Sequence, residues 1–190
     1  VTSTCSHPDH SGAIDELIDR TGAERIELVD GDTILGTEFR ITAHDMGGPV
    51  ANHKSFLLEE ERTLISGKLI SEDLSIPLIS EDSDLIQYHA SFQKIMKMRL
   101  KRFAPAFGHV IEDPKGAVAS TIENFNKVDE EILKAIKKGA TSPEEVVTAN
   151  HSKVSDPEQA AEIAKSIEVH LTKLANDKSV KQLKSGWKIR

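Results

Sequence analysis

The stretch V-T-S-T-C-S-H-P-D-H-S-G-A-I, residues 1–14, places a cysteine, two histidines and an aspartate within six positions. Its first residues are typical of the end of a strand, and residues 13–21 have the apolar spacing of an amphipathic helix that ends at Gly22. His7, Asp9 and His10 therefore lie in a turn between a strand and a helix. Loops of this kind often present metal ligands, so the stretch raises the hypothesis of a metal site.

Length, charge and cysteine content limit what the chain can be. A chain of 190 residues can bury one substantial core and carry a small appended unit. The net charge of −7 argues against a general nucleic-acid binder. The single cysteine excludes an internal disulfide framework and favours a reducing, intracellular compartment, so Cys5 is interpreted as buried, reactive or ligating. No apolar run approaches the roughly 18 residues that span a bilayer, and we expect no membrane association.

The middle third predicts a meander of short strands, and the last third predicts helices. Runs rich in β-branched residues occupy residues 25–29, 33–42 and 54–70, with turns at 30–32 and 59–61. Helices are predicted at 84–103, at about 116–138, after the cap Ser142 and from Asp156 to near Asn176. The basic tail can close as a short hairpin. This order predicts a winged-helix-like region at 140–190, after a domain at 1–139.

The opening stretch resembles the T-H-x-H-x-D-H-x-G signature of metallo-β-lactamase-fold hydrolases, and the rest resembles the beta-lactamase-like protein 2 branch of that superfamily. A-N-H-K-S-F-L-L-E-E-E-R-T-L-I-S-G-K-L-I is similar to the stretch from the family's G-H-T-x-x-H loop to its S-G-D. R-F-A-P-A-F-G-H-V-I is similar to its P-G-H-G-P-V-I loop, and A-K-S-I-E-V-H-L-T-K-L to its last helix. The resemblance covers nearly the whole chain.

The resemblance implies an α/β fold, the metallo-β-lactamase αββα sandwich, with a C-terminal winged-helix-like helical region. Family members carry a further region ahead of the motif, which forms the first strands of the sandwich. This chain begins at the motif, so we expect a sandwich that is incomplete at its N-terminus, with an open apolar face that a partner would cover.

The resemblance also implies a set of zinc-ligand positions, of which four are altered here. The family's first motif serves both metals, a later loop adds a histidine, the S-G-D aspartate bridges the metals, and the P-G-H histidine completes the second site. His7, Asp9 and His10 match this pattern. The altered positions are Cys5, Pro49 (or Gly48 if the alignment slips by one), Lys68 and Phe107.

These changes bear directly on activity. A hydrolytic zinc needs three protein ligands and an open position for water, whereas each site here keeps two ligands at best. Cys5 could ligate as a thiolate and His109 could replace the last histidine, but neither supplies the bridging carboxylate. Lys68 instead places a cation there, where it could pair with Asp9.

We therefore expect no resident cofactor, no catalytic residue and a vestigial site at His7, Asp9 and His10. The expected function is that of an inactive structural or interaction subunit in a larger assembly that can contain RNA, in the mitochondrial matrix or the cytoplasm. Two alternatives stay open: a mononuclear remnant, and an active zinc-dependent hydrolase of endoribonuclease or thioesterase type with a rearranged metal site.

Basic residues in two places are candidates for contact with RNA or an acidic partner, because the family branch is associated with cleavage of single-stranded RNA. The first group follows one predicted helix and comprises Lys94, Lys97, Arg99, Lys101 and Arg102. The second lies in the tail, where Lys181 and Lys184 accompany Trp187, an aromatic residue able to stack on a base. A solvated surface is the simpler interpretation of both groups.

Three other histidines carry weaker hypotheses. His44 precedes Asp45, an adjacency that usually marks a polar loop rather than a catalytic pair. His53 matches a family histidine that is not a zinc ligand and is expected to pack or to line a pocket. His170 is expected at a helix interface.

Overall fold

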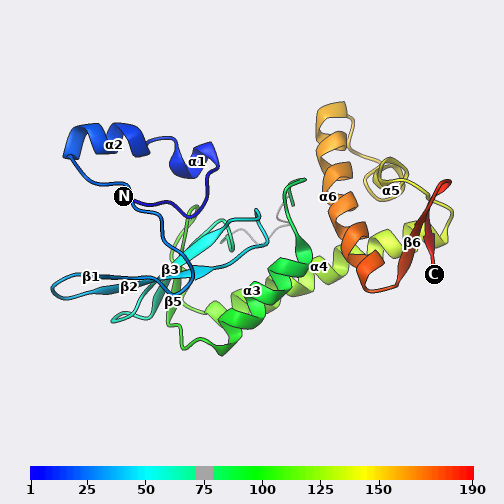
Figure 1. The fold of residues 1–190 in the computed structure, drawn as a ribbon. Coiled ribbons are helices and arrows are strands. Elements are labelled where there is room, and N and C mark those ends of the chain that lie inside the picture. The colour runs from blue at the N-terminus through cyan, green and yellow to red at the C-terminus, as the bar shows by residue number, and fades with distance from the viewer. Residues whose placement is uncertain (72–78) are drawn as a thin grey trace.

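The computed structural model describes residues 1–71 and 79–190 as a five-stranded sheet, helices on either side of it, and a two-stranded ribbon at the C-terminus (Figure 1). The elements in chain order are α1 (Pro8–Ser11), α2 (Ile14–Thr21), β1 (Thr33–Leu35), β2 (Arg40–Asp45), β3 (Lys54–Leu58), β4 (Thr63–Gly67), α3 (Leu85–Lys97), β5 (Arg102–Pro105), α4 (Pro114–Lys137), α5 (Pro143–Asn150), α6 (Pro157–Asn176), β6 (Val180–Leu183) and β7 (Gly186–Ile189).

The sheet has the order β1-β2-β3-β4-β5. Strands β1 to β4 pair antiparallel, which confirms the predicted meander for this part of the chain, and β5 pairs parallel with β4. The strand expected at residues 25–29 does not form. Ile26 and Val29 are exposed there, and the Val29 N–H donates to the Asp32 carboxylate of the following turn.

The helix predicted over residues 84–103 is shorter than expected, because α3 ends at Lys97 and residues 102–105 form β5 instead. Leu64 and Phe103 are paired residues of β4 and β5, and both are fully buried. Phe103 also exchanges two backbone hydrogen bonds with Ile111. Pairing with the sheet on one side and with the following loop on the other holds this segment extended.

The two faces of the sheet have different neighbours. Leu57 and Leu64 point toward α3 and α4 and join a core with Phe92, Ile95 and Val118. Helices α3 and α4 cover this face, whereas α1 and α2 lie on the opposite side of the sheet (Figure 1). Each large apolar side chain fully buried in this core contributes about 1.5–3 kcal/mol to stability.

The long helix α4 runs from this core into a second one. There its C-terminal half packs with α5, α6 and the β6–β7 ribbon around Leu171 and Trp187. Ser142 and Asp156 accept backbone N–H groups at the starts of α5 and α6, as their sequence signatures predict. The winged-helix-like assignment of residues 140–190 and the boundary after residue 139 stay predictions. None of the helices in the described ranges is long and apolar enough to cross a membrane.

Candidate functional site

Several loops meet at the edge of the sheet where β4 and β5 end. The Lys54 N–H donates to the Thr4 carbonyl at 2.7 Å and ties the N-terminal segment to the start of β3. The Ala106 N–H donates to the Gly67 carbonyl at 3.0 Å and ties the loop after β5 to the end of β4. Both connections bring candidate ligand positions of the sequence toward one edge of the sheet.

His53 is the buried anchor of this edge. Its side chain is 1% exposed, and its Nδ1 lies 3.1 Å from the Met46 carbonyl, so Nδ1 carries the ring proton. Its Nε2 then accepts the Lys68 backbone N–H at 3.1 Å. Burial lowers the pKa of His53 to about 4, against the opposing effect of the Met46 carbonyl. Both ring nitrogens are thus used in holding the backbone, which is the packing role expected of this residue.

The turn at residues 67–68 is fitted tightly to this histidine. Gly67 has a φ of 57°, a conformation that favours glycine, and a Cβ there would lie 2.8 Å from both His53 Nε2 and the Thr4 side chain. The backbone at the position of the implied bridging ligand is therefore fixed by its neighbours. Its side chain, Lys68, is only partly buried.

The motif residues His7, Asp9 and His10 lie on or next to α1. The His7 Nδ1 accepts the Asp9 N–H at 3.2 Å and caps this short helix. The Asp9 side chain is 62% exposed. His10 is half-buried, and its Nε2 is a buried atom without a hydrogen-bond partner. Burial, with the positive charges of Lys68 and His7, lowers the pKa of His10. A neutral imidazole with one free nitrogen therefore faces this edge.

The expected ion pair between Asp9 and Lys68 is not formed, since Lys68 makes no ion pair with any described residue. Helix α1 turns the Asp9 carboxylate to solvent and toward His7, at 3.5 Å from its Nδ1. Burial, with the Lys68 charge as a further cause, lowers the pKa values of His10 and His53. The charge of Asp9 opposes this shift at His10 without forming an ion pair with Lys68.

The residues present do not fit a zinc centre. Within residues 1–71 and 79–190, no three His, Cys, Asp or Glu side chains are grouped so as to hold a metal ion. Cys5 is buried and not in a disulfide, and Pro49 is buried with its carbonyl accepting from Ser83. The Phe107 ring lies edge-on to His10, with 5.7 Å between the ring centroids. His109 lies exposed on the same loop. The ring of His10 thus packs against a phenyl ring at the position where the resemblance implies a further histidine ligand.

A hollow of about 370 Å³ adjoins this edge on the face of the sheet that α3 and α4 do not cover. Ile34, Ile41, Phe56 and Ile65 form much of its wall, and the polar lining residues are Thr2, Ser3, Thr4 and His10. Apolar walls with few polar groups suit binding of an apolar surface better than chemistry on a charged substrate.

The two basic groups are only partly available to a partner. The Lys94 ammonium is bound within the chain by Asp30 at 2.6 Å, and Arg102 lies 3.7 Å from Glu112. Lys97, Arg99, Lys101, Lys181 and Lys184 are exposed. The proposed stacking role of Trp187 is wrong, because this side chain is 6% exposed in the C-terminal core and its Nε1–H donates to Glu168 at 3.3 Å.

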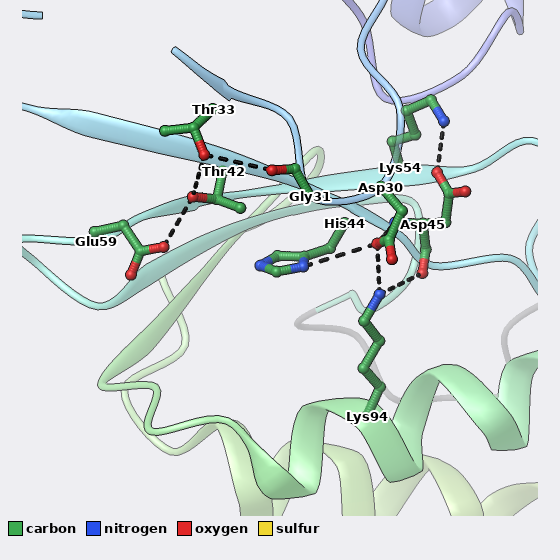
Figure 2. Close-up of polar contacts among 9 residues, drawn as sticks. All are labelled: Asp30, Gly31, Thr33, Thr42, His44, Asp45, Lys54, Glu59 and Lys94. Carbon is green, nitrogen blue, oxygen red and sulfur yellow. Dashed lines mark hydrogen bonds and ion pairs between the residues drawn. The ribbon is translucent and has the colours of Figure 1, made fainter. Parts of the chain in front are cut away.

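Figure 2 shows why His44 and Asp45 do not form a catalytic pair. As neighbours on β2 they point to opposite sides of the strand, and His44 Nδ1 lies 3.9 Å from Asp30 instead. Asp30 also accepts the Asp45 N–H at 2.8 Å and the Lys94 ammonium, whose hydrogen bond holds the pKa of Asp30 below its usual value. The network joins the turn before β1 to β2 and α3 and serves the fold.

Sequence reasoning missed a buried polar cluster in the helical half. His170 packs at the expected helix interface, but its Nδ1 also lies 2.7 Å from the Asp129 carboxylate, which accepts Lys173 at 2.7 Å with its other oxygen. The sequence did contain one signal for this cluster. Asp129 falls on the same face of α4 as the apolar residues Phe125 and Ile132, and an acid at such a position is expected to be buried with them.

Comparison with known proteins shows which proteins the chain is similar to. No protein-family model matches the chain. A beta-lactamase-like protein 2 homolog from Caenorhabditis elegans is 30% identical over 151 residues, which cover 69% of this chain and 49% of that protein. Lactamase-like protein aptB from Emericella nidulans is 24% identical over 197 residues, which cover 92% of this chain and 62% of that protein. An atrochrysone carboxyl ACP thioesterase from Claviceps purpurea is 25% identical over 142 residues, covering 68% and 44%. The chain thus spans about half the length of the curated relatives it matches.

Solved structures share the fold at low sequence identity. A metallo-beta-lactamase family protein from Thermus thermophilus has a TM-score of 0.71 and 15% identity, over 95% of this chain and 64% of its own. A beta-lactamase domain protein from Burkholderia ambifaria has a TM-score of 0.71 and 17% identity, and the match covers 94% of this chain and 60% of that protein. The sheet, the helices over one face and the C-terminal helical region are thus matched together.

Proposed function

Because the chain belongs to the metallo-β-lactamase-fold superfamily and is related to beta-lactamase-like protein 2, we propose that it keeps this fold without a hydrolytic zinc centre and acts as a structural or interaction subunit. The observation that carries the proposal is Lys68, a lysine at the position of the implied bridging carboxylate, whose backbone N–H donates to His53 Nε2 at 3.1 Å. A bound dication would meet the like charge of this lysine, which adds to the effect of burial in lowering the pKa of His10.

The ring of Phe107, which packs against His10, supports the same conclusion. A zinc ion on His10 Nε2 would need two further protein ligands. The phenyl ring that packs edge-on to His10 offers none, and the Asp9 carboxylate is turned to solvent. The edge is a polar remnant held together by backbone hydrogen bonds.

The interaction role is supported by apolar side chains left exposed on and beside the sheet. Leu35 is 70% exposed, Phe39 45%, Ile65 39% and Phe107 58%. Ile65 lines the apolar hollow and Phe107 packs against His10, another residue of its lining, whereas Leu35 points to the other face of the sheet. The hollow with Ile65 and Phe107 forms a surface typical of protein contacts. The partner of this proposal is a protein segment that presents apolar side chains to that face.

RNA contact is a narrower proposal, since the net charge is −7 and both Lys94 and Trp187 are engaged within the chain. It would rest on the exposed Lys97, Arg99, Lys101, Lys181 and Lys184. The location in the mitochondrial matrix or the cytoplasm stays a prediction.

Metal analysis of the chain purified from zinc-supplemented medium tests the central proposal. We expect far less than one zinc per chain. The variant with Cys5→His, Pro49→His, Lys68→Asp and Phe107→His restores the implied ligand types and should bind zinc. A matched control keeps the three histidine substitutions and Lys68, and carries Lys97→Asp instead. Its net charge is the same as that of the first variant, but the new carboxylate lies at the end of α3 and not at the candidate site. Stoichiometric zinc in the natural chain, lost on His10→Ala, would overturn the proposal.

A zinc-dependent hydrolase remains the second candidate, favoured by the similarity to a thioesterase over 68% of the chain. It predicts hydrolysis of an acyl thioester that requires added zinc and disappears in His7→Ala and His10→Ala. The first proposal predicts no zinc-dependent turnover with or without these substitutions. The same preparations can be assayed with single-stranded RNA for the endoribonuclease form of this candidate.

A further inference from the structure

A second hollow lies in the helical half of the molecule, in the region where α6 packs on α4 and α5 (Figure 1). Its volume is about 360 Å³, inside the range of about 300–1,000 Å³ typical of small-molecule pockets. Its walls come from α4, from α6 and from the connection between α5 and α6. The apolar lining residues are Phe125, Val128, Val154, Ile163 and Ile167.

One wall of this hollow is a buried polar group with fixed orientation. His170 is 1% exposed, lines the hollow, and lies edge-on to Phe125 with 6.0 Å between ring centroids. Burial alone would raise the pKa of Asp129, but hydrogen bonds from His170 and Lys173 outweigh it and hold that pKa below its usual value. The ionised carboxylate accepts from Nδ1 of His170 and so fixes the orientation of this ring.

The charged side chains that line the hollow are acidic. Glu131 on α4 and Glu162 on α6 belong to its lining, which includes no lysine or arginine among the described residues. Neither glutamate forms an ion pair with another described residue, and both are exposed. The nearby Lys173 ammonium is already bound by Asp129 at 2.7 Å and Asp177 at 3.1 Å. Two exposed carboxylates thus stand beside an apolar interior, and the charge of Glu162 also acts on the neighbouring Lys165.

We propose that this hollow is a binding site for a small organic cation, an amine with an aromatic or aliphatic body. The apolar body packs against Phe125 and Ile167, and the ammonium group lies between the carboxylates of Glu131 and Glu162. The aromatic ring of Phe125 belongs to the lining and adds a cation–π partner for the ligand. An anionic ligand would meet two like charges, and the described lining includes no lysine or arginine to offset them.

Three probes of the same shape and different charge test the proposal on the whole chain. Protonated 2-phenylethylamine, neutral 2-phenylethanol and anionic 3-phenylpropanoate are titrated separately into isotopically labelled protein, and backbone amide shifts are followed by NMR. We expect the amine to shift amides that line the hollow, to bind at least about threefold more tightly than the alcohol, and the carboxylate to give no shifts there. Equal responses to all three probes, or none, would overturn the proposal.

Charge variants locate the effect. Glu131→Gln combined with Glu162→Gln should weaken amine binding by about fivefold, toward the level of the alcohol. Glu130→Gln combined with Glu158→Gln changes the same net charge on the same two helices outside the hollow and should leave binding unchanged. Ile163→Trp fills the hollow and should remove the shifts for every probe. An equal loss in the control pair would show that the amine responds only to overall charge and would also overturn the proposal.

Discussion

Mild acid should destabilise the fold through His53. The pKa of this side chain is about 4 in the folded chain because burial penalises the imidazolium, whereas an unfolded histidine titrates near 6.5. Between these values the unfolded state binds the extra proton and the folded state does not. The contribution of His53 to stability is therefore fully present above about pH 6.5 and is lost as the pH falls toward 4.

The size of this loss follows from the difference between the two pKa values. At about 1.4 kcal/mol per pKa unit, a shift from 6.5 to about 4 corresponds to about 3.5 kcal/mol. A loss of that size is a substantial part of the 5–15 kcal/mol or so that stabilises a typical domain. Burial also lowers the pKa values of His10, His44 and His89, which adds a slope of the same sign.

Urea unfolding followed by circular dichroism, from about pH 7.5 to about pH 4.5, isolates the share of His53 when wild type is compared with His53→Gln. The glutamine amide does not titrate, so the variant should be less stable at neutral pH yet lose about 2–3 kcal/mol less on acidification. His7→Gln, at an exposed histidine, should follow the wild-type curve. Parallel pH dependences for wild type and His53→Gln would refute the reasoning.

Three further substitutions probe the backbone turn and the two buried polar contacts. Gly67→Ala should lower the free energy of unfolding in urea by about 1–3 kcal/mol, and more than Gly22→Ala, whose φ of 68° is similar but whose Cβ would meet nothing within 4 Å. Asp129→Ala should cost about 3–5 kcal/mol in the same assay, because it leaves the buried His170 without its partner, and a loss below 1 kcal/mol or so would contradict that account. Trp187, the single tryptophan, should resist quenching by acrylamide in the native chain, and Trp187→Phe should cost about 1 kcal/mol for the hydrogen bond to Glu168; ready quenching would contradict its burial.

Local signals predicted the helices of the last third well and β5 poorly, for one physical reason. Caps such as Ser142 and Asp156 act within a single turn, so their effect is visible in the sequence alone. Leu100 and Phe103 continue the helical spacing of Ile95, so the pattern predicts more helix. Only the pairing of Phe103 with Leu64 and Ile111, distant in sequence, makes this segment a strand.

The candidate site divides in the same way. The family motif predicted which positions would matter at the sheet edge, but side-chain partners were set by contacts across the fold. Lys94 finds Asp30, which is 64 residues away, and Lys68 acts on His10 and His53 rather than on Asp9. An aromatic residue among lysines, such as Trp187, is typical of a surface that stacks on bases. In the fold, however, Trp187 packs against the C-terminal helices and belongs to their core. Such choices depend on tertiary packing, which residue spacing does not encode.

The hydrogen bonds of His53 explain how this edge of the sheet keeps its shape. Both ring nitrogens bind the backbone, at Met46 and at Lys68, and the Lys68 contact uses its N–H rather than its side chain. The turn at residues 67–68 therefore holds whatever side chain follows Gly67. Lys68→Ala should accordingly leave stability nearly unchanged while raising the pKa of His10, which the Lys68 charge now lowers. The shift is measurable by NMR titration of the ring protons. A stable Lys68→Ala with an unchanged His10 titration would remove the charge argument on which the metal-free assignment rests.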